Sequence, residues 1–306
     1  MWWWWKNVLA ATLLSTVTFD LQGVYGFTYT PGGVPLAVKS PFLSTWKLGS
    51  VPMGRSWPLS GGNLGITAWV GFARVDDVLY SFLGAPAASG SWFGSSPRTK
   101  DFEITATQTI YTFECGGVDV KVTFINPIEP SDFTRLSLPF VYVSIIASSN
   151  DGASHRVQVY SDLTGEWLSE DVRKTMTWST TKSDNLILHT FSLAPQNQFQ
   201  TTDNRVEYGQ AYHAMLPSEG VTYQIAGDRV VRGGFNTTGH LNNTADTDFR
   251  AISNNWPCFS FAKDLGNITN PSPPVVFAVG LSRDPAISYT ASGTQQSRSL
   301  FYRTQF

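Results

Sequence analysis

The stretch FEITATQTIYTFECGGVDVKVTF, residues 102–124, alternates apolar and polar side chains on both sides of a glycine pair. Apolar residues recur through 102–113, and after Gly116-Gly117 they stand at every second position of 118–124. A period of two places successive side chains on opposite faces of a strand, and glycine accepts the positive φ angles of a tight turn. The stretch therefore predicts an antiparallel β-hairpin with one buried face.

Similar patterns continue toward the C-terminus. Further strands are predicted at 140–146, 157–159, 175–180, 186–191, 221–225 and 274–281. Residues 140–146 are almost wholly apolar, which is typical of a central strand buried on both faces. No window keeps a helical apolar spacing for three turns, and 209–215 is the candidate for a single helical turn. We expect an all-β protein, a large antiparallel β-sandwich of the supersandwich type with very little helix.

The composition indicates a large buried core and few charges. Of the 306 residues, 42% are hydrophobic and 14% are charged, whereas an average soluble protein has roughly 25% charged residues. The formal net charge is −2, and basic residues are scattered, with Arg173-Lys174 the densest cluster. Nucleic-acid binding, which needs a basic patch that follows the phosphates, is not expected.

The first 26 residues have the organisation of a secretory signal peptide. Lys6 precedes the apolar run 8–14, and Val24-Tyr25-Gly26 offers a cleavage site before Phe27. A membrane anchor is the alternative, but the run is shorter than the roughly 20 apolar residues that span a bilayer. We expect a secreted, extracellular protein with no membrane span in its mature chain.

Two further features bear on an extracellular location. N-glycosylation sequons begin at Asn236, Asn242 and Asn267, and we expect them on a solvent-exposed surface. The two cysteines, Cys115 and Cys258, either form one disulfide that closes a long loop or remain buried free thiols.

Two groups of charged residues are candidates for chemistry. Asp162, Glu166 and Glu170 are close enough in sequence to supply a glycosidase's acid and base, or they form a solvated acidic loop after a strand. Arg74 and Asp76 lie on one side of a predicted strand, where they either pair at the strand end or bind a polar ligand. The sequence thus offers no unambiguous catalytic group.

Tryptophans and histidines are the remaining candidates for binding a ligand or a metal. Tryptophans can form a sugar-stacking platform or belong to the core. The candidates for such a platform are Trp46, Trp57, Trp69, Trp92, Trp167, Trp178 and Trp256. The four histidines have no metal-site spacing, and no glycine-rich turn precedes a helix that could hold a phosphate. We expect no metal and no cofactor.

With these residues in view, the chain resembles the amino-terminal domain of the fungal glutaminase A family. The matching stretches are PLAVKSPFLSTW (35–46), WVGFARVD (69–76), YSFLG (80–84), SLPFVY (137–142), DGASH (151–155), VYSD (159–162), Glu166-Trp167 and Trp256-Pro257. The similarity runs in order over nearly the whole mature chain, so no single short motif carries it.

The resemblance implies a secreted relative of enzymes that hydrolyse L-glutamine to glutamate and ammonia, with the catalytic groups in a helical (α/α) barrel. It implies a signal peptide at 1–26, a β-sandwich at 27–285 and a linker at 286–306 toward a barrel that this chain lacks. The chain alone is then expected to be inactive and to support the barrel. Contact or cleft-wall residues are expected at Trp46, Arg74, Asp76, Asp162, Glu166 and Trp167.

Two other functions stay open. One is a stand-alone carbohydrate-binding module, which requires an exposed, coplanar pair of Trp or Tyr rings. The other is a small hydrolase that uses Asp162 and Glu166.

Overall fold

Eight antiparallel strands form the larger of two main sheets. In spatial order they are β13 (Met176–Lys182), β14 (Ile187–Leu193), β17 (Gln210–Met215), β21 (Val275–Ser282), β11 (Phe140–Ser149), β10 (Val118–Ile125), β9 (Gln108–Cys115) and β8 (Arg98–Ile104). The computed structural model describes residues 31–304 apart from 50, 63, 89–90 and 204. The predicted signal peptide at 1–26 lies outside the described residues.

Six strands form the second sheet. Their order is β19 (Thr244–Ala245), β18 (Val221–Gly227), β20 (Pro257–Ile268), β12 (His155–Thr164), β4 (Trp69–Val75) and β5 (Val78–Leu83). All neighbours pair antiparallel except β18 and β19, which are parallel.

Smaller elements surround the two sheets, all of them within the compact unit Gly32–Phe306. The short strands are β1 (Gly33–Val38), β2 (Ser44–Leu48), β3 (Leu59–Ser60), β6 (Ala87–Ala88), β7 (Ser91–Trp92), β15 (Thr201–Thr202), β16 (Arg205–Val206), β22 (Ile287–Ala291) and β23 (Thr294–Arg298). The helices are α2 (Phe133–Ser137) and α3 (Asp228–Thr238), with single turns η1 (Met53–Arg55), η2 (Gly165–Trp167) and η3 (Phe301–Thr304). None of the described helices is long and apolar enough to cross a membrane.

The main core lies between the two sheets. Alternate side chains of β10 and β11 are fully buried and meet the buried side chains of β4, β12 and β20 in one cluster. Each aliphatic or phenyl side chain buried in this way contributes roughly 1.5–3 kcal/mol to the hydrophobic stabilisation. The predicted all-β sandwich is therefore the observed fold.

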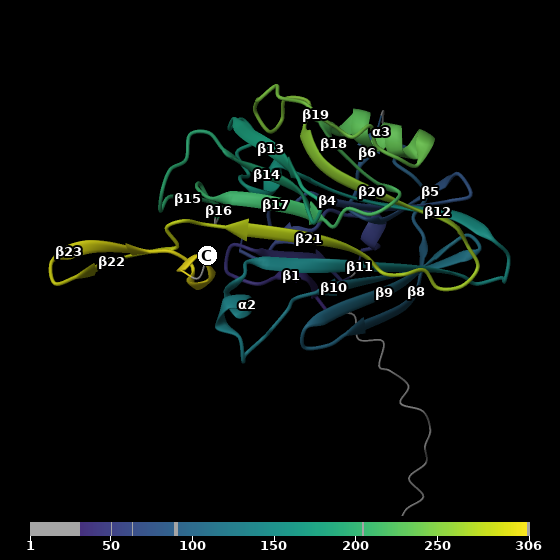
Figure 1. The fold of residues 1–306 in the computed structure, drawn as a ribbon, viewed down its shortest axis with the longest axis horizontal. Coiled ribbons are helices and arrows are strands. Elements are labelled where there is room, and N and C mark those ends of the chain that lie inside the picture. The colour runs from purple at the N-terminus through teal and green to yellow at the C-terminus, as the bar shows by residue number, and fades with distance from the viewer. Residues whose placement is uncertain (1–30, 50, 63, 89–90, 204, 305–306) are drawn as a thin grey trace, which may run out of the picture. The chain divides into compact units, whose positions relative to one another are not determined.

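The outer face of the six-stranded sheet is also covered, by α3 (Figure 1). Val231 and Phe235 of the helix pack on Phe72 of β4 and Tyr160 of β12. The ring centroids of Tyr160 and Phe235 are 4.9 Å apart. The six-stranded sheet is thus a middle layer with apolar side chains on both faces.

The hairpin predicted from residues 102–124 is confirmed for its second half. Cys115 of β9 pairs with Val118 of β10, and the two glycines form the turn, with Gly116 at φ 63°. The first half is not one strand, because β8 ends at Ile104 and a turn precedes β9. The Thr105 hydroxyl accepts hydrogen bonds from the backbone N–H of Thr107 and Gln108, which stabilises that turn.

Four other expectations differ from the structure. The helical turn expected at 209–215 is strand β17, because pairing with β14 and β21 satisfies its backbone.

Helix α3 was not predicted, since its Gly233-Gly234 pair lowers helix propensity and packing on the sheet has to compensate for it. Strand β11 is buried on one face rather than two. The expected linker 286–306 contains the hairpin β22–β23 and η3.

The two cysteines do not form a disulfide. Cys115 and Cys258 are both buried free thiols. Cys115 belongs to the core between the sheets, whereas Cys258 lies beneath α3 in the second cluster. Burial raises the pKa of both thiols above the ordinary range.

Two histidines face each other inside the main core. His189 of β14 is the cross-strand partner of His213 of β17, and both are fully buried. Burial lowers the pKa of His189 to about 3 and that of His213 to about 4. His213 Nδ1 is 3.0 Å from the carbonyl oxygen of Phe259, and its Nε2 has no partner among the described residues. Both imidazoles are therefore neutral in the folded state near neutral pH.

We predict that this histidine pair makes the protein acid-sensitive. An unfolded imidazole has a pKa of about 6.5, so below that pH the unfolded state binds more protons, and each histidine removes up to about 1.4 kcal/mol of stability per pH unit. The loss runs from about pH 6.5 down toward the folded pKa values of about 4 and about 3. Urea unfolding at pH 7.0, 6.0, 5.0 and 4.5 measures the slope.

The His213→Leu variant tests the assignment. Its stability should fall less steeply with acid than that of the wild type, by about 1.4 kcal/mol per pH unit. His240→Gln, which changes an exposed side chain, serves as the control and should keep the wild-type slope. Equal slopes for His213→Leu and the wild type would contradict the role of His213.

Candidate docking surface

Asp162, the first of the predicted acidic residues, lies inside the molecule in an ion pair. It is on the outer face of β12 and is fully buried. Arg232 of α3 donates to both of its carboxylate oxygens, at 2.8 Å each. The Tyr160 hydroxyl donates to Asp162 Oδ2 at 2.6 Å, and Arg232 also pairs with Asp228 at 3.0 Å. With every oxygen engaged, Asp162 attaches α3 to the sheet.

The charges in this ion pair affect one another. Burial by itself would lower the pKa of the Arg232 guanidinium. The Asp162 carboxylate outweighs this effect and raises that pKa well above its ordinary value. Burial, and then the Asp162 charge, raises the pKa of the Tyr160 hydroxyl. The guanidinium also lies 5.9 Å from the ring centroid of Trp57. Asp162 is therefore a structural anion.

The other two acidic residues follow β12 around η2. Thr164 donates a hydrogen bond to Glu166, and burial raises the pKa of Glu166. Glu170 pairs with Arg205 at 3.5 Å. Arg205 Nη2 in turn donates to the carbonyl oxygen of Ile66 at 2.8 Å. The segment is thus a set of internal contacts rather than a solvated acidic loop.

Trp167 and Trp46 also serve internal packing. Trp167 is buried, and its indole N–H donates to the carbonyl oxygen of Ala68 at 2.8 Å. Trp46 of β2 is half-buried and donates to Ser44 Oγ at 2.9 Å. None of the tryptophan side chains described by the structure is exposed, and Trp92 lies outside that set. No tryptophan platform for stacking a sugar is present among them.

Arg74 and Asp76 do not pair with each other. Asp76 is the first residue of a two-residue turn between β4 and β5, where it and Asp77 have positive φ angles. Arg74 instead contacts Asp77 at 2.6 Å and donates to the carbonyl oxygens of Asn236 and Thr237 at the end of α3. Its charge satisfies the unpaired carbonyl groups of the last helical turn.

Asp76 and Asp151 each contact one ring nitrogen of His155. His155 Nδ1 is 2.6 Å from Asp76 Oδ2, and Nε2 is 3.0 Å from Asp151 Oδ1. Hydrogen bonds to Asp76 and then Asp151 raise the pKa of His155, and the same contact holds the pKa of Asp76 low. This group joins the β4–β5 turn to the loop between β11 and β12. The six residues predicted for contacts are therefore spread over separate internal interactions.

The outer face of the eight-stranded sheet, which faces away from the core, was not among the functional surfaces predicted from the sequence. The adjacent strands β14, β17, β21 and β11 contain no Asp, Glu, Lys or Arg. By contrast, ion pairs join β8 to its neighbour β9, through Arg98 and Glu114, and across β9 to β10, through Lys100 and Asp119. We call the outward side of the four uncharged strands the uncharged face. The sequence signal that could have indicated this face is the absence of charge in four strand segments: 140–149, 187–193, 210–215 and 275–282.

Aromatic side chains cover the centre of the uncharged face. Phe140 of β11 lies across Gly280 of β21, where any larger side chain would collide with its ring. The Phe140 ring thereby reaches Tyr212 of β17, with centroids 5.5 Å apart. Phe140, Tyr142 and Tyr212 are half-buried, and Val276 is 40% exposed. The face is an uncharged surface of aromatic, aliphatic and hydroxyl side chains that no described element covers completely.

Apolar groups continue beyond one edge of this face, next to α2. Phe133 of α2 is 68% exposed and Ile128 is 62% exposed. Phe133 meets Phe301 of η3 edge-on, with centroids 6.4 Å apart. A cavity of about 430 Å³ lies between Ile128, Phe140 and Tyr142. The end of the described chain therefore lies beside the uncharged face (Figure 1).

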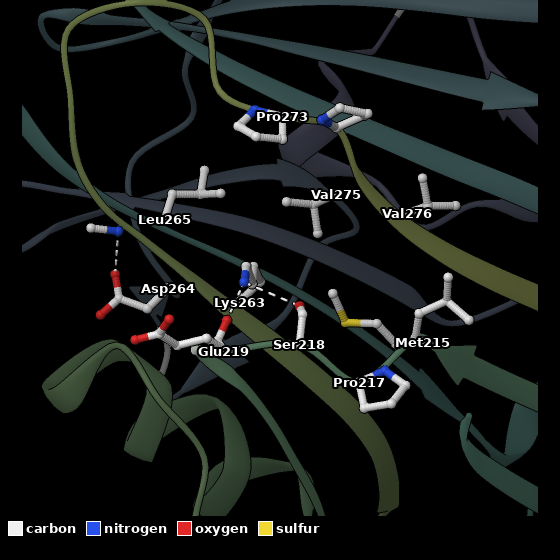
Figure 2. A pocket seen from close by; sticks show the side chains of 14 residues that line it. Met215, Pro217, Ser218, Glu219, Lys263, Asp264, Leu265, Pro273, Val275 and Val276 are labelled. Carbon is white, nitrogen blue, oxygen red and sulfur yellow. Dashed lines mark hydrogen bonds between the residues drawn. The ribbon is translucent and has the colours of Figure 1, made fainter. Parts of the chain in front are cut away.

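A larger open pocket lies at the start of β21. Its volume is about 910 Å³, and Val275 and Val276 line one side of it. Figure 2 shows Lys263 reaching toward Ser218, to which its ammonium donates at 3.2 Å. Prolines and aliphatic groups form most of the remaining wall: Pro217, Leu216, Leu265, Pro273 and Pro274. Val276 joins this pocket to the uncharged face.

The described residues contain no group of three or more side chains that could hold a metal ion.

Comparison of the sequence with known proteins finds a matching family and relatives named as glutaminases. Residues 107–306 match the family described as "Domain of unknown function (DUF5127)". The chain is 36% identical over 287 residues to "Glutaminase A" of Aspergillus oryzae, covering 89% of this chain and 40% of that protein. It is 27% identical over 296 residues to a "Probable glutaminase" of Arthroderma benhamiae, covering 86% of this chain and 33% of that protein. The resemblance expected from the sequence is confirmed.

The solved structures found are more distant. A putative kojibiose phosphorylase from the human microbiome matches with a TM-score of 0.35 at 11% identity, over 82% of this chain and 24% of that one. The heparan sulfate lyase HepC of Pedobacter heparinus matches with a TM-score of 0.31 at 11% identity, over 68% and 28%.

We predict that removing Arg232 alone from its pair with Asp162 strongly destabilises the protein. Arg232→Met leaves a buried carboxylate without its partner, which should cost about 3–5 kcal/mol of the free energy of unfolding. Arg229→Met, on the exposed side of the same helix, should change it by no more than about 0.5 kcal/mol. Urea unfolding at pH 7 measures both, and equal effects would contradict the assignment.

Proposed function

This chain belongs to the DUF5127 family, and on that premise we propose that it is the non-catalytic β-sandwich module of a secreted glutaminase A-like protein. In this proposal the module supports a helical-barrel domain that carries the catalytic groups. The observation that carries it is the coverage: the match extends over most of this chain but over less than half of either glutaminase relative. Most of the length of such a protein therefore lies outside this module.

The uncharged face supports a role in packing against another domain. Its four strands lack charged residues, and its aromatic and aliphatic side chains are only partly covered. Interface cores are depleted in charge and enriched in aromatic side chains, as this face is. Residues 301–304, at the end of the described chain, lie beside it next to α2.

The engaged state of Asp162 and Glu166 fits a supporting rather than a catalytic role. Asp162 is fully buried and bound by Arg232 and Tyr160, so it has no free oxygen for a substrate. Glu166 alone cannot supply both the acid and the base that a hydrolase of this kind needs. The hydrolase alternative is therefore less well supported than the supporting module.

We predict that the purified chain releases no ammonia from L-glutamine. The test joins this chain to the remainder of Aspergillus oryzae glutaminase A, in place of the aligned residues of that protein. We expect the chimera to hydrolyse glutamine with a kcat within tenfold of the A. oryzae enzyme. Ammonia release by this chain alone, or a folded chimera without activity, would contradict the proposal.

The same chimera tests the docking surface. Val276→Lys places an ammonium on the uncharged face, where docking would bury it without a partner at a cost of several kcal/mol. The variant should lower the thermal midpoint of the chimera while leaving that of the chain alone unchanged. Lys121→Glu, an exposed change on β10, is the control and should affect neither protein.

We also propose that the chain is secreted and glycosylated. Asn236, Asn242 and Asn267 are all exposed, so each side chain is accessible for modification. We predict that a fungal host exports the chain and that enzymatic removal of N-glycans lowers its mass. Replacing all three residues with Gln should abolish that change in mass. An exported chain with an unmodified mass would contradict the glycosylation proposal.

A further inference from the structure

The hairpin β22–β23 has a well-defined turn and register. Ile287 is opposite Arg298 at its base, and Ala291 is opposite Thr294 at its tip. The two residues between them, Ser292 and Gly293, both have positive φ angles, 51° and 76°. A two-residue turn with two positive φ angles matches the right-handed twist of the strands and fixes their register.

Among the described residues, the contacts that attach the hairpin to the rest of the protein lie at its base. The Tyr208 hydroxyl donates to the carbonyl oxygen of Pro285 at 3.0 Å. On the opposite side, Asp284 accepts from Ser299 at 2.6 Å and pairs with Arg303 at 3.3 Å. These contacts hold the segments that enter and leave the hairpin.

Beyond this base, the polar contacts that the described part of the chain shows for the hairpin are internal to it. The side-chain hydrogen bonds of the described residues 287–298 all stay within that range. Figure 1 shows both strands extending away from the two main sheets, with no third strand beside them. A hairpin of two strands is at best marginally stable in water, because stability needs a third strand or a packed face.

One face of the hairpin is suited to such packing. Ile287 and Tyr289 lie on it and are 59% and 39% exposed. The Arg298 guanidinium is 5.7 Å from the centroid of the Tyr289 ring on the same face. The opposite face consists of short hydroxyl and amide side chains, namely Ser288, Thr290, Gln295 and Ser297. Thr294, Gln296 and Arg298 share the face of Ile287 and Tyr289. That face, which we call the apolar face, carries the large apolar side chains of the hairpin and has no partner among the described residues.

We propose that the apolar face of β22–β23 docks on the part of a glutaminase A-like protein that this chain does not span. The inference rests on the proposed function and adds a specific contact to it. Three observations point to this occupant rather than to another. The glutaminase relatives extend well beyond the length of this chain. The hairpin follows directly from β21, a central strand of the uncharged face, and η3 then returns to the edge of that face. A domain that packs on this face next to η3 would therefore start close to the base of the hairpin, where Arg303 and Ser299 contact Asp284.

Hydrogen exchange in the chimera with A. oryzae glutaminase A tests this docking. Backbone amides of 287–298 should exchange at least tenfold more slowly in the chimera than in this chain alone. The double variant Ile287→Ser/Tyr289→Ser should remove that protection and lower the thermal midpoint of the chimera. It should leave the midpoint of the chain alone unchanged, since both side chains are exposed there.

Thr290→Ala/Ser297→Ala, on the opposite face, is the matched control and should keep the protection. A chimera that is active but exchanges these amides as fast as the chain alone would overturn the docking and leave the proposed function standing. A chimera that does not fold or hydrolyse glutamine would overturn both. Protection of the amides in the chain alone that increases with protein concentration would instead identify a second copy as the occupant, and would also overturn the proposal.

Discussion

The structure depends on one constraint, that each apolar face of a β-sheet has to be covered. The inner faces of the two main sheets cover each other and form the main core. The six-stranded sheet is apolar on its outer face as well, and α3 covers that face with Val231 and Phe235. The eight-stranded sheet has no equivalent cover among the described elements. Its outer face stays uncharged and half-exposed over four strands, and this asymmetry is what suggests an interface.

Covering the outer face of the six-stranded sheet required an electrostatic contact as well as apolar packing. The helix carries a glycine pair, which weakens it, so its position depends on the sheet. Arg232 binds the buried Asp162 near the middle of the helix, and Arg74 binds the carbonyl groups at its C-terminal end. A buried charge pair of this kind fixes geometry more than it adds net stability, because desolvation offsets much of the attraction. Two of the residues that suggested a ligand site are thus the contacts that hold α3.

The surfaces proposed for docking are continuous in the fold. The uncharged face, the pocket at Val276 and the hairpin β22–β23 all adjoin β21, at its middle, its start and its end. A single partner domain along this strand would reach all three. This arrangement agrees with the relatives, in which the matched region is a minor part of a longer protein. The proposed supporting role builds on this geometry.

The sequence by itself determined the fold class, most strands and the family, because alternation with a period of two and turn residues are local signals. It also predicted the β9–β10 hairpin with its glycine turn. Only the tertiary structure decided the roles of charged residues, since a carboxylate such as Asp162 is identical in sequence whether it faces solvent or an arginine seventy residues away. The same holds for α3 and for β17, whose backbone conformation is set by the sheet they join rather than by propensity. Of the function, the sequence established only the relation to the glutaminase family, because an interface is defined by which faces remain uncovered after folding.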